Sequence, residues 1–221
     1  MTKIEPKSSS LDPELAIGWP ATKVTKSLEA AEKTLLIQFL KRRYEERFLN
    51  PIQTLRSAPK NSHGCAFAVM ALSSMLIETM QCYRQGLPTT NQPEFDELKK
   101  AIKVPQEYHI PKVESGREVF KSFFSFPAHR VLFCGIDGEI FYRDIRNGVV
   151  HQGQTKSGWK IEKGQTQLWN DQERIVDSDQ FASAIESAFN LYIDELSKAK
   201  WDDKVWKRAR RKIWWLTKSS Q

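Results

Sequence analysis

The sequence GCAFAVMALSSMLIETMQCY, residues 64–83, decides the fold of this 221-residue chain. Glu78 is its only charged residue, and on a helix its apolar side chains would lie nearly all round. Such a helix is stable in water when other elements cover it on every side, as in the centre of a helical bundle. The segment therefore predicts a mainly α-helical protein built around a buried helix at 64–83.

Amphipathic helices on both sides of this segment supply the rest of the predicted bundle. One is expected to begin at Ser27, a favourable N-cap residue, and to end near Phe48, before Pro51. Another is expected to begin at Ser178 or Asp179 and to bury one apolar stripe. That stripe consists of Phe181, Ile185, Ala188, Tyr192 and Leu196.

The chain between these helices is less regular. A short helix is expected around 94–103, and Ser115 is expected to cap a helix whose phenylalanines belong to the core. These are Phe120, Phe123, Phe124 and Phe126. Residues 131–138 suggest a short extended piece, and residues 159–161 and 168–176 suggest a small β-hairpin insertion.

The sequence RNGVVH, residues 146–151, combines groups suited to chemistry on a phosphodiester. Arginine carries a permanent charge and a planar fork of donors that matches phosphate. Histidine, with an unperturbed pKa of about 6.5, can give or take a proton near neutral pH. Arg146 and His151, with Asn147 beside them, therefore form a candidate site for phosphate binding and proton transfer without a metal.

Two local structures compete for this segment. Asn147-Gly148 between apolar runs is a strong hairpin signal, because both residues tolerate positive φ. Helical spacing fits the surrounding residues better, and Gly153 is placed to end the helix. One face would carry Phe141, Ile145 and Val149. A second face would carry Arg143, Asn147 and His151, with Arg146 at its side. We therefore predict a helix.

A helix bearing Arg-Asn-x3-His in a mostly helical chain resembles the HEPN superfamily, whose signature is Arg, four to six residues, then His. The resemblance covers Leu28 to Leu196 in architecture and the hexapeptide 146–151 in specific motif. It implies an HEPN-like helical bundle at 27–197, with residues 1–26 as a poorly ordered N-terminal arm and 198–221 as a basic amphipathic helix.

The resemblance also implies an activity. Many HEPN proteins are metal-independent endoribonucleases that act as toxins or as antiphage and abortive-infection effectors. They work as homodimers in which two motif helices face each other across a groove. By that resemblance Arg146 would bind the phosphate, His151 would transfer protons, and Asn147 would orient one of them. RNA would be the substrate, an antitoxin or defence protein a further partner, and no cofactor would be needed.

Two other functional classes remain open at this level. The first is a non-catalytic HEPN-type module that binds RNA or a partner, and the second is a helical interaction protein. Glu78 is expected to form a structural pair with an arginine such as Arg143, or to support the site. Arg143 in turn would either extend the phosphate site or serve that pairing.

The C-terminal segment, residues 198–221, carries the whole net charge of +7, since it holds nine Lys or Arg and two Asp. In the rest of the chain the numbers of basic and acidic residues are equal. Its tryptophans alternate with basic residues, as in nucleic-acid binding surfaces. The RNA-binding candidates are Lys207, Arg208, Arg210, Arg211 and Lys212. Membrane-surface binding and packing of the aromatic face on the body are the alternatives.

Composition favours a cytoplasmic protein. The first twenty residues lack the apolar core of a secretory signal, and the apolar stretch 65–77 is too short to predict a membrane span. Three widely spaced cysteines indicate reduced thiols. His63 and Cys65 are a lone pair of metal-ligating residues, so no metal site is predicted.

Overall fold

The computed structural model describes residues 12–57 and 63–219. These form a mainly α-helical protein, as the sequence predicts, with two small sheets where one hairpin is expected. The central helix is α4 (His63–Gln85), close to the predicted limits. Four of the other helices make the most extensive contacts with it. They are α3 (Asn50–Arg56), α6 (Gly116–Ser125), α10 (Ser178–Lys198) and α11 (Lys204–Ser219).

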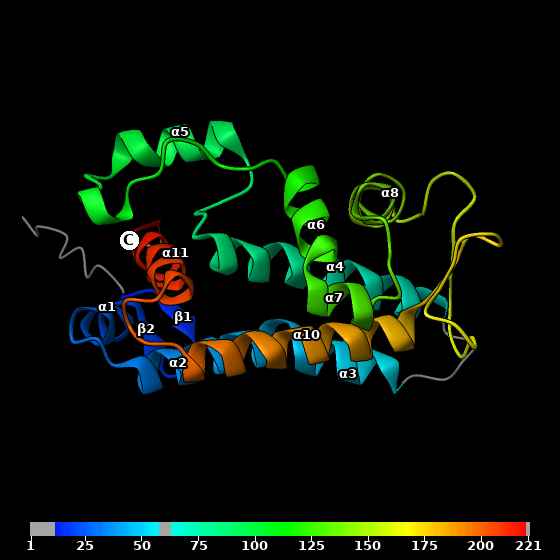
Figure 1. The fold of residues 1–221 in the computed structure, drawn as a ribbon, viewed down its shortest axis with the longest axis horizontal. Coiled ribbons are helices and arrows are strands. Elements are labelled where there is room, and N and C mark those ends of the chain that lie inside the picture. The colour runs from blue at the N-terminus through cyan, green and yellow to red at the C-terminus, as the bar shows by residue number, and fades with distance from the viewer. Residues whose placement is uncertain (1–11, 58–62, 220–221) are drawn as a thin grey trace, which may run out of the picture.

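Figure 1 shows α4 running through the middle of the molecule, roughly parallel to α10. Leu76, Ile77 and Met80 of α4 are completely buried, which explains why this helix lacks a polar face. By length and composition alone, residues 64–85 would be able to cross a membrane, although 56% of the most apolar stretch is buried inside the protein. In this structure the apolar side chains of α4 form part of the hydrophobic core.

The first described residues are ordered on the body, so the predicted arm at 1–26 is wrong for that part. β1 (Glu14–Ala16) pairs antiparallel with β2 (Trp19–Pro20), and α1 (Ala21–Glu29) follows at once. Residues 1–11 of the predicted arm lie outside the described residues. Leu15 is buried and its carbonyl accepts hydrogen bonds from Arg43 and Arg47. Burial of a short apolar patch therefore fixes this segment.

The helix predicted from Ser27 to Phe48 is divided. Ser27 lies inside α1 and is buried, and the chain turns at Ala31, whose φ is +56°. Next come α2 (Lys33–Tyr44), the π-helical turn η1 (Glu45–Leu49) and α3. Pro51 does not end the helix as predicted, because it occupies the first turn of α3, where a missing N–H is tolerated.

The middle of the chain agrees in part with the prediction. The short helix α5 (Gln92–Ala101) is present, and Ser115 caps α6 by accepting a hydrogen bond from the Glu118 amide. Phe120, Phe123 and Phe124 are buried as expected, whereas Phe126 is exposed. The 3-10 turn η2 (Gln106–Tyr108) lies between these helices.

Residues 131–138 are not extended as predicted. α7 (Pro127–Leu132) covers the start of this range, and α8 (Gly138–Ile140) begins at its end. The proline provides a favourable first helical turn. An ideal Cβ on Gly138 would lie 2.7 Å from the Phe120 carbonyl oxygen, so this glycine allows α8 to approach α6 closely.

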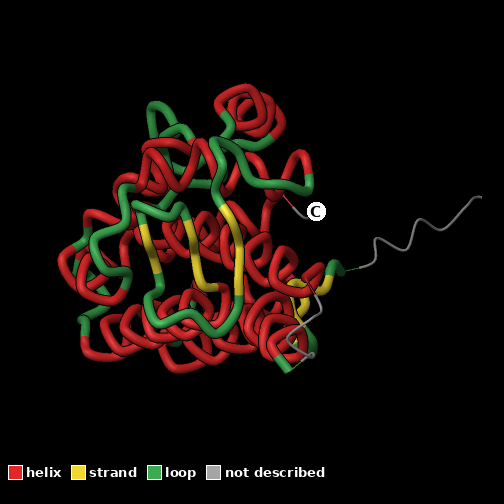
Figure 2. Tube along the Cα trace, turned by 90° about the vertical axis from the view of Figure 1, so that its right-hand side faces the viewer, coloured by secondary structure: helices red, strands yellow, loops and turns green. Residues whose placement is uncertain are grey.

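The predicted hairpin is a three-stranded sheet in the order β3-β5-β4. β4 (Trp169–Asn170) and β5 (Ile175–Asp177) form an antiparallel pair, while β3 (Lys160–Glu162) is parallel to β5. Figure 2 shows the three strands side by side at one end of the helical body. Asp177, rather than Ser178 or Asp179, caps α10, and the predicted apolar stripe of α10 is buried.

Candidate active site

The segment that carries RNGVVH is helical, which excludes the hairpin. It consists of the π-helical turn η3 (Phe141–Arg146) followed by α9 (Asn147–Gln152). Phe141, Ile145 and Val149 are buried on one face, as the spacing predicts. Gly153 ends the helix in the left-handed conformation, with φ of +65°. A π-helical turn inside an α-helix is rare and is frequently found at functional sites.

Gly148 has a role that its sequence neighbours do not indicate. It is helical, not in a turn, and an ideal Cβ there would lie 2.3 Å from the Gln154 carbonyl oxygen and 3.0 Å from Thr155 Cα. The missing side chain therefore lets the chain after Gly153 fold back against the helix. The amide of Lys156 then bonds to the Asp144 carbonyl at 2.8 Å, which ties this loop to η3.

Arg146 makes three polar contacts at once. Its Nη1 donates to Asn147 Oδ1 and lies 3.0 Å from both that oxygen and His151 Nε2. Its Nη2 lies 2.9 Å from Glu78 Oε2, on α4. The guanidinium also lies over the Tyr142 ring, 5.5 Å from its centroid. The predicted trio Arg146, Asn147 and His151 is thus brought together, and Glu78 joins it.

Glu78 pairs with Arg146, so the predicted pairing with Arg143 is wrong. The other oxygen of Glu78 accepts a hydrogen bond from the Thr90 hydroxyl. The Glu78 and Arg146 side chains are only 20% and 17% exposed, which makes the pair partly buried. A carboxylate on an apolar helix has therefore found its counter-charge in the motif arginine.

Arg143 lies apart from this group and does not extend the phosphate site in this structure. It is exposed and forms a two-pronged ion pair with its neighbour Asp144, with N–O distances of 2.8 and 2.6 Å. Asp144 is buried, and the hydrogen bonds from Arg143 lower its pKa below the usual value. The need of a buried carboxylate for a counter-charge explains the position of Arg143.

His151 is exposed to solvent at the end of the site. Because a guanidinium only donates hydrogen bonds, the Nε2 atom that faces Arg146 acts as the acceptor. The Nε2 lone pair becomes available to another donor once Arg146 turns to another acceptor.

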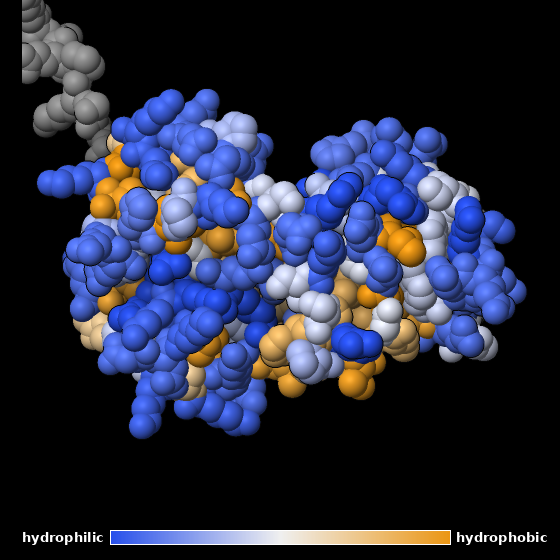
Figure 3. Space-filling view, turned by 45° about the horizontal axis from the view of Figure 1, so that its top comes forward, coloured by the Kyte–Doolittle hydropathy of each residue, from blue (hydrophilic) through white to orange (hydrophobic). Residues whose placement is uncertain are grey.

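A groove of about 350 Å³ begins beside Arg146 and Glu78. Its lining comes from α4, the start of α5 and the segment before it, η3, α9 and α11. It includes the hydroxyl residues Thr79, Thr89 and Thr90 and the cation Lys212. Met75 and Val150, which are exposed apolar residues, also line it. On the face seen in Figure 3 the surface is mostly hydrophilic, with separate hydrophobic patches.

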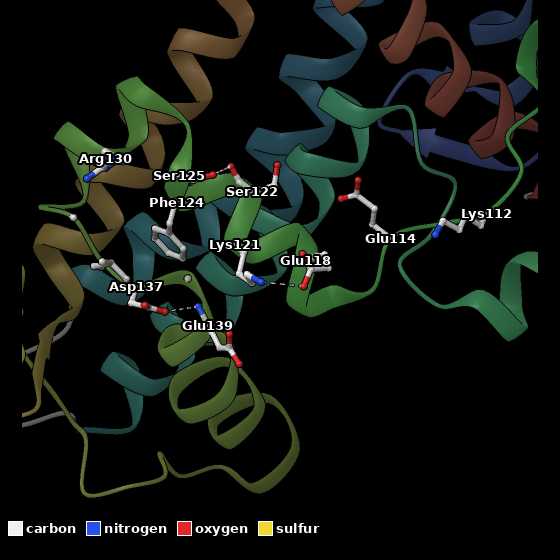
Figure 4. A pocket seen from close by; sticks show the side chains of 13 residues that line it. Lys112, Glu114, Glu118, Lys121, Ser122, Phe124, Ser125, Arg130, Asp137 and Glu139 are labelled. Atoms are coloured by element: carbon white, nitrogen blue, oxygen red, sulfur yellow. Dashed lines mark hydrogen bonds and ion pairs between the residues drawn. The ribbon is translucent and has the colours of Figure 1, made fainter.

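A larger hollow, of about 750 Å³, lies elsewhere, between α6 and α8. Figure 4 shows two of the contacts among the side chains that line it: Lys121 pairs with Glu118, and the Asp137 carboxylate accepts a hydrogen bond from the Glu139 amide. It contains no histidine or free cysteine. The contacts around Arg146 are more specific, so we place the candidate site there.

The basic helix packs on the body instead of presenting a row of free cations. Trp206 and Trp215 are almost completely buried, and Trp206 Nε1 donates to the Leu196 carbonyl at 2.8 Å. Of the five RNA-binding candidates, Lys207 is exposed and the other four are partly buried. Arg208 donates to the Arg84 carbonyl, Arg210 pairs with Asp202, and Lys212 donates to the Pro88 carbonyl. This arrangement favours the packing alternative for the helix.

No three His, Cys, Asp or Glu side chains cluster in a way that would hold a metal ion within the residues that the structure describes. Cys65, Cys82 and Cys134 are free thiols, and burial raises the pKa of Cys82 to about 11. The side chain of His63 is not among those described.

Residues that sequence reasoning missed support the site from outside the hexapeptide. Thr90 holds Glu78, Tyr142 lies under Arg146, and Asp144 anchors the following loop. An ideal Cβ on Gly116 would lie 3.0 Å from the Tyr142 ring, so α6 fixes the position of that ring. Of these residues, Asp144 alone is noticeable in the sequence, because it is a carboxylate between two apolar positions of one helix and therefore needs a counter-charge.

We find no match to a protein-family model, to a curated protein or to a solved structure. The functional argument therefore rests on the residues and their geometry.

Proposed function

We propose that this protein is a metal-independent endoribonuclease of the HEPN type that cleaves RNA by attack of a ribose 2′-hydroxyl on the adjacent phosphate. The observation that supports it is the contact of one guanidinium, Arg146, with both a carboxylate and a solvent-exposed histidine. A phosphate-binding group, a proton acceptor and a group that orients them thus lie within one cluster. A toxin or antiphage effector is the biological role that such an activity suggests.

Arg146 is the proposed phosphate-binding residue. Glu78 holds Nη2 in place, while Nη1 faces the open side of the site, towards His151. A phosphate oxygen is a stronger acceptor than a neutral imidazole, since hydrogen bonds between two charged groups are shorter and stronger. Substrate binding therefore draws Nη1 from His151 to the phosphate and stabilises the charge that develops on the pentacoordinate phosphorus.

His151 is the proposed proton-transfer residue. When Nη1 turns to the phosphate, Nε2 becomes free to accept the proton of the 2′-hydroxyl, while Asn147 keeps the guanidinium in place through its side-chain oxygen. The 2′-oxygen then bonds to phosphorus as the bond between phosphorus and the 5′-oxygen breaks. The leaving 5′-oxygen takes a proton from water, and His151 gives its proton back to the solvent. The products are a 2′,3′-cyclic phosphate and a 5′-hydroxyl. Proton transfer of this kind contributes about 10²–10⁴ in rate, and positioning supplies the rest.

A second copy of the chain is the expected partner. Met75 on α4 and Val150 on α9 are 48% and 37% exposed and both lie next to the candidate site. Exposed apolar side chains at the rim of a polar site are typical of a surface that another protein covers. We therefore propose a homodimer whose two motif helices face each other across the RNA.

A non-catalytic binding module is the second candidate. The observation that favours it is that Glu78 already neutralises Arg146 and that Arg146 already occupies His151 Nε2. A closed network of this kind also serves to hold α4 and α9 together, or to recognise a partner. In that case RNA or a protein would bind at the groove without being changed.

Cleavage of single-stranded RNA in excess EDTA distinguishes the two. The proposed groups need no metal, so the nuclease should cut RNA under these conditions and leave DNA of the same sequence intact, because DNA lacks the internal nucleophile. Strict dependence on Mg²⁺ or Mn²⁺ would contradict the mechanism. Tight binding with no cleavage by the dimer would favour the binding module.

A further inference from the structure

The groove beside Arg146 contains a second cation, which the proposed chemistry does not use. Lys212 lines it from α11, a helix that follows the motif by about fifty residues. Its ammonium donates one hydrogen bond, to the Pro88 carbonyl. Within residues 12–57 and 63–219 it forms no ion pair with a carboxylate. Two of its three N–H donors therefore remain for another acceptor.

The surroundings of Lys212 make its charge unfavourable in the free protein. Burial lowers its pKa below the usual value for lysine, and the nearby Cys82 thiol stays neutral because burial raises its pKa to about 11. The negative charges of Glu94 and Glu78 act through space in the opposite direction and offset this effect only in part. An ammonium held away from water without a direct ion pair raises the free energy of the folded state. An anion that bonds to the Lys212 ammonium would lower this penalty.

Two carboxylates also line the groove, and both are already engaged. Glu78 accepts from Arg146 and from Thr90. Glu94 accepts from the Thr89 hydroxyl at 2.7 Å and lies in the first turn of α5, where the helix dipole offsets its charge. Neither carboxylate forms an ion pair with Lys212, although both raise its pKa through space. The remaining N–H donors of Lys212 are therefore available to a ligand.

The groove is large enough for more than a single ion. Its volume of about 350 Å³ compares with about 30 Å³ for one water molecule in the liquid. The hydroxyls of Thr89 and Thr90 already donate to Glu94 and Glu78, so among the three threonines that line the groove Thr79 is the one left to donate to a phosphate. Space, the two cations and the Thr79 hydroxyl together fit a ligand with a second phosphate.

We propose that Lys212 binds a phosphate group that enters this groove beside the phosphate held by Arg146. The inference rests on the proposed function, because it assigns Arg146 to the scissile phosphate. The second phosphate is either the next one of the same RNA strand or a free phosphate or nucleotide. Lys212 would then be the one RNA-binding candidate of the basic helix that acts inside the site rather than on the surface.

The experiment compares Lys212→Met with Lys204→Met, which removes an exposed lysine at the start of the same helix. The strand probe is a single-stranded 2′-O-methyl RNA, which binds but lacks the nucleophile, and the free-phosphate probe is inorganic pyrophosphate. Affinity for the strand is measured against salt concentration, and pyrophosphate binding by calorimetry. Thermal melting reports folding, and Lys212→Met should melt at or above wild type, because it removes an unpaired buried charge.

We expect Lys212→Met to lower the slope of log affinity against log salt by about 0.7, the value for one lost phosphate contact on a single strand. It should also weaken binding of the strand or of pyrophosphate by about tenfold or more. Lys204→Met should change neither. Loss of strand binding alone identifies the RNA phosphate as the ligand, and loss of pyrophosphate binding identifies a free phosphate.

Equal salt slopes and equal pyrophosphate affinities for wild type and Lys212→Met would overturn the proposal, as would a wild-type protein that binds neither probe. Failure of the nuclease function alone gives a different pattern. RNA would remain uncut while pyrophosphate still bound in a Lys212-dependent manner. If Lys212→Met does not fold, Lys212→Gln retains a donor to the Pro88 carbonyl without the charge and gives the same comparison.

Discussion

Glu78 and Arg146 are 68 residues apart in the chain, and their side chains meet at 2.9 Å. This ion pair joins the central helix α4 to the motif helix and sets the direction of the guanidinium. The rest of the candidate site depends on it, because the same guanidinium contacts His151. Two segments that the sequence leaves unconnected thus form one site.

The first prediction concerns this pair. A double-mutant cycle with Glu78→Ala and Arg146→Ala should give a coupling energy of about 1–2 kcal/mol in chemical unfolding, between the values for exposed and fully buried pairs. Glu78→Gln should keep the hydrogen bond and most of the stability. Additive single and double variants would show that the pair does not hold α4 to the motif helix.

The second prediction concerns Gly148. Alanine there places Cβ 2.3 Å from the Gln154 carbonyl oxygen, so the loop has to move. We expect Gly148→Ala to destabilise the protein by about 1–3 kcal/mol, despite the better helix propensity of alanine. The matched control is Gly64→Ala on α4, where nothing lies within 4 Å of the new Cβ. Gly64→Ala should melt at or slightly above the wild-type temperature. Equal melting temperatures for the two variants would contradict the close approach of the Gln154 carbonyl to Gly148.

A third prediction separates the aromatic and charged sides of α11. Trp206 is completely buried, so Trp206→Ala should lower the free energy of unfolding by about 3–5 kcal/mol. Lys207, its neighbour in the chain, is exposed, so Lys207→Ala should change the free energy of unfolding by less than about 0.5 kcal/mol. Removal of residues 200–221 should for the same reason give an unstable protein. A soluble, cooperatively folded truncation would show that the helix is not part of the core.

The fourth prediction concerns pH. His129 is completely buried, its Nδ1 lies 2.9 Å from the Phe123 carbonyl, and burial lowers its pKa to about 4. The unfolded chain, with a histidine pKa of about 6.5, therefore binds the proton more readily. Stability is fully present above about pH 6.5 and falls as the pH drops towards 4, by up to about 3 kcal/mol.

Urea unfolding at pH 7 and pH 4.5 tests this, with His129→Phe as the comparison. Phenylalanine suits the surrounding rings of Phe123, Phe126 and Phe133. The Phe123 carbonyl keeps its bond from the Phe126 amide, so no acceptor is orphaned. The variant should lose less stability between the two pH values than wild type. Equal losses would assign the acid sensitivity to other groups.

Sequence reasoning succeeded where one helix face decides the structure. The buried segment 64–83, the stripe of α10 and the cap at Ser115 all follow from periodicity or local hydrogen bonding. It failed for β1 and β2, because two or three residues are too few to show a period. It also failed at 131–138, where a proline-initiated turn overrides extended propensity.

The site was predicted in its local part and missed in its long-range part. Arg146, Asn147 and His151 belong to one helix, so their meeting follows from spacing. The sequence predicts an arginine as the partner of Glu78, and the structure has one, but it is Arg146 and not the example Arg143. The sequence does not show that the buried Asp144 holds Arg143. The place of Lys212 in the groove depends on how α11 packs on α4, which no local pattern encodes.

The proposed role of Arg146 and His151 is tested most directly by the ends of cleaved RNA. Wild-type protein, His151→Ala and the control His109→Ala, an exposed histidine outside the site, are incubated with single-stranded RNA in excess EDTA. We predict 2′,3′-cyclic phosphate and 5′-hydroxyl ends from wild type and His109→Ala, and no cleavage by a fully folded His151→Ala. Undiminished cleavage by His151→Ala, or no cleavage by the wild-type protein, would contradict the account.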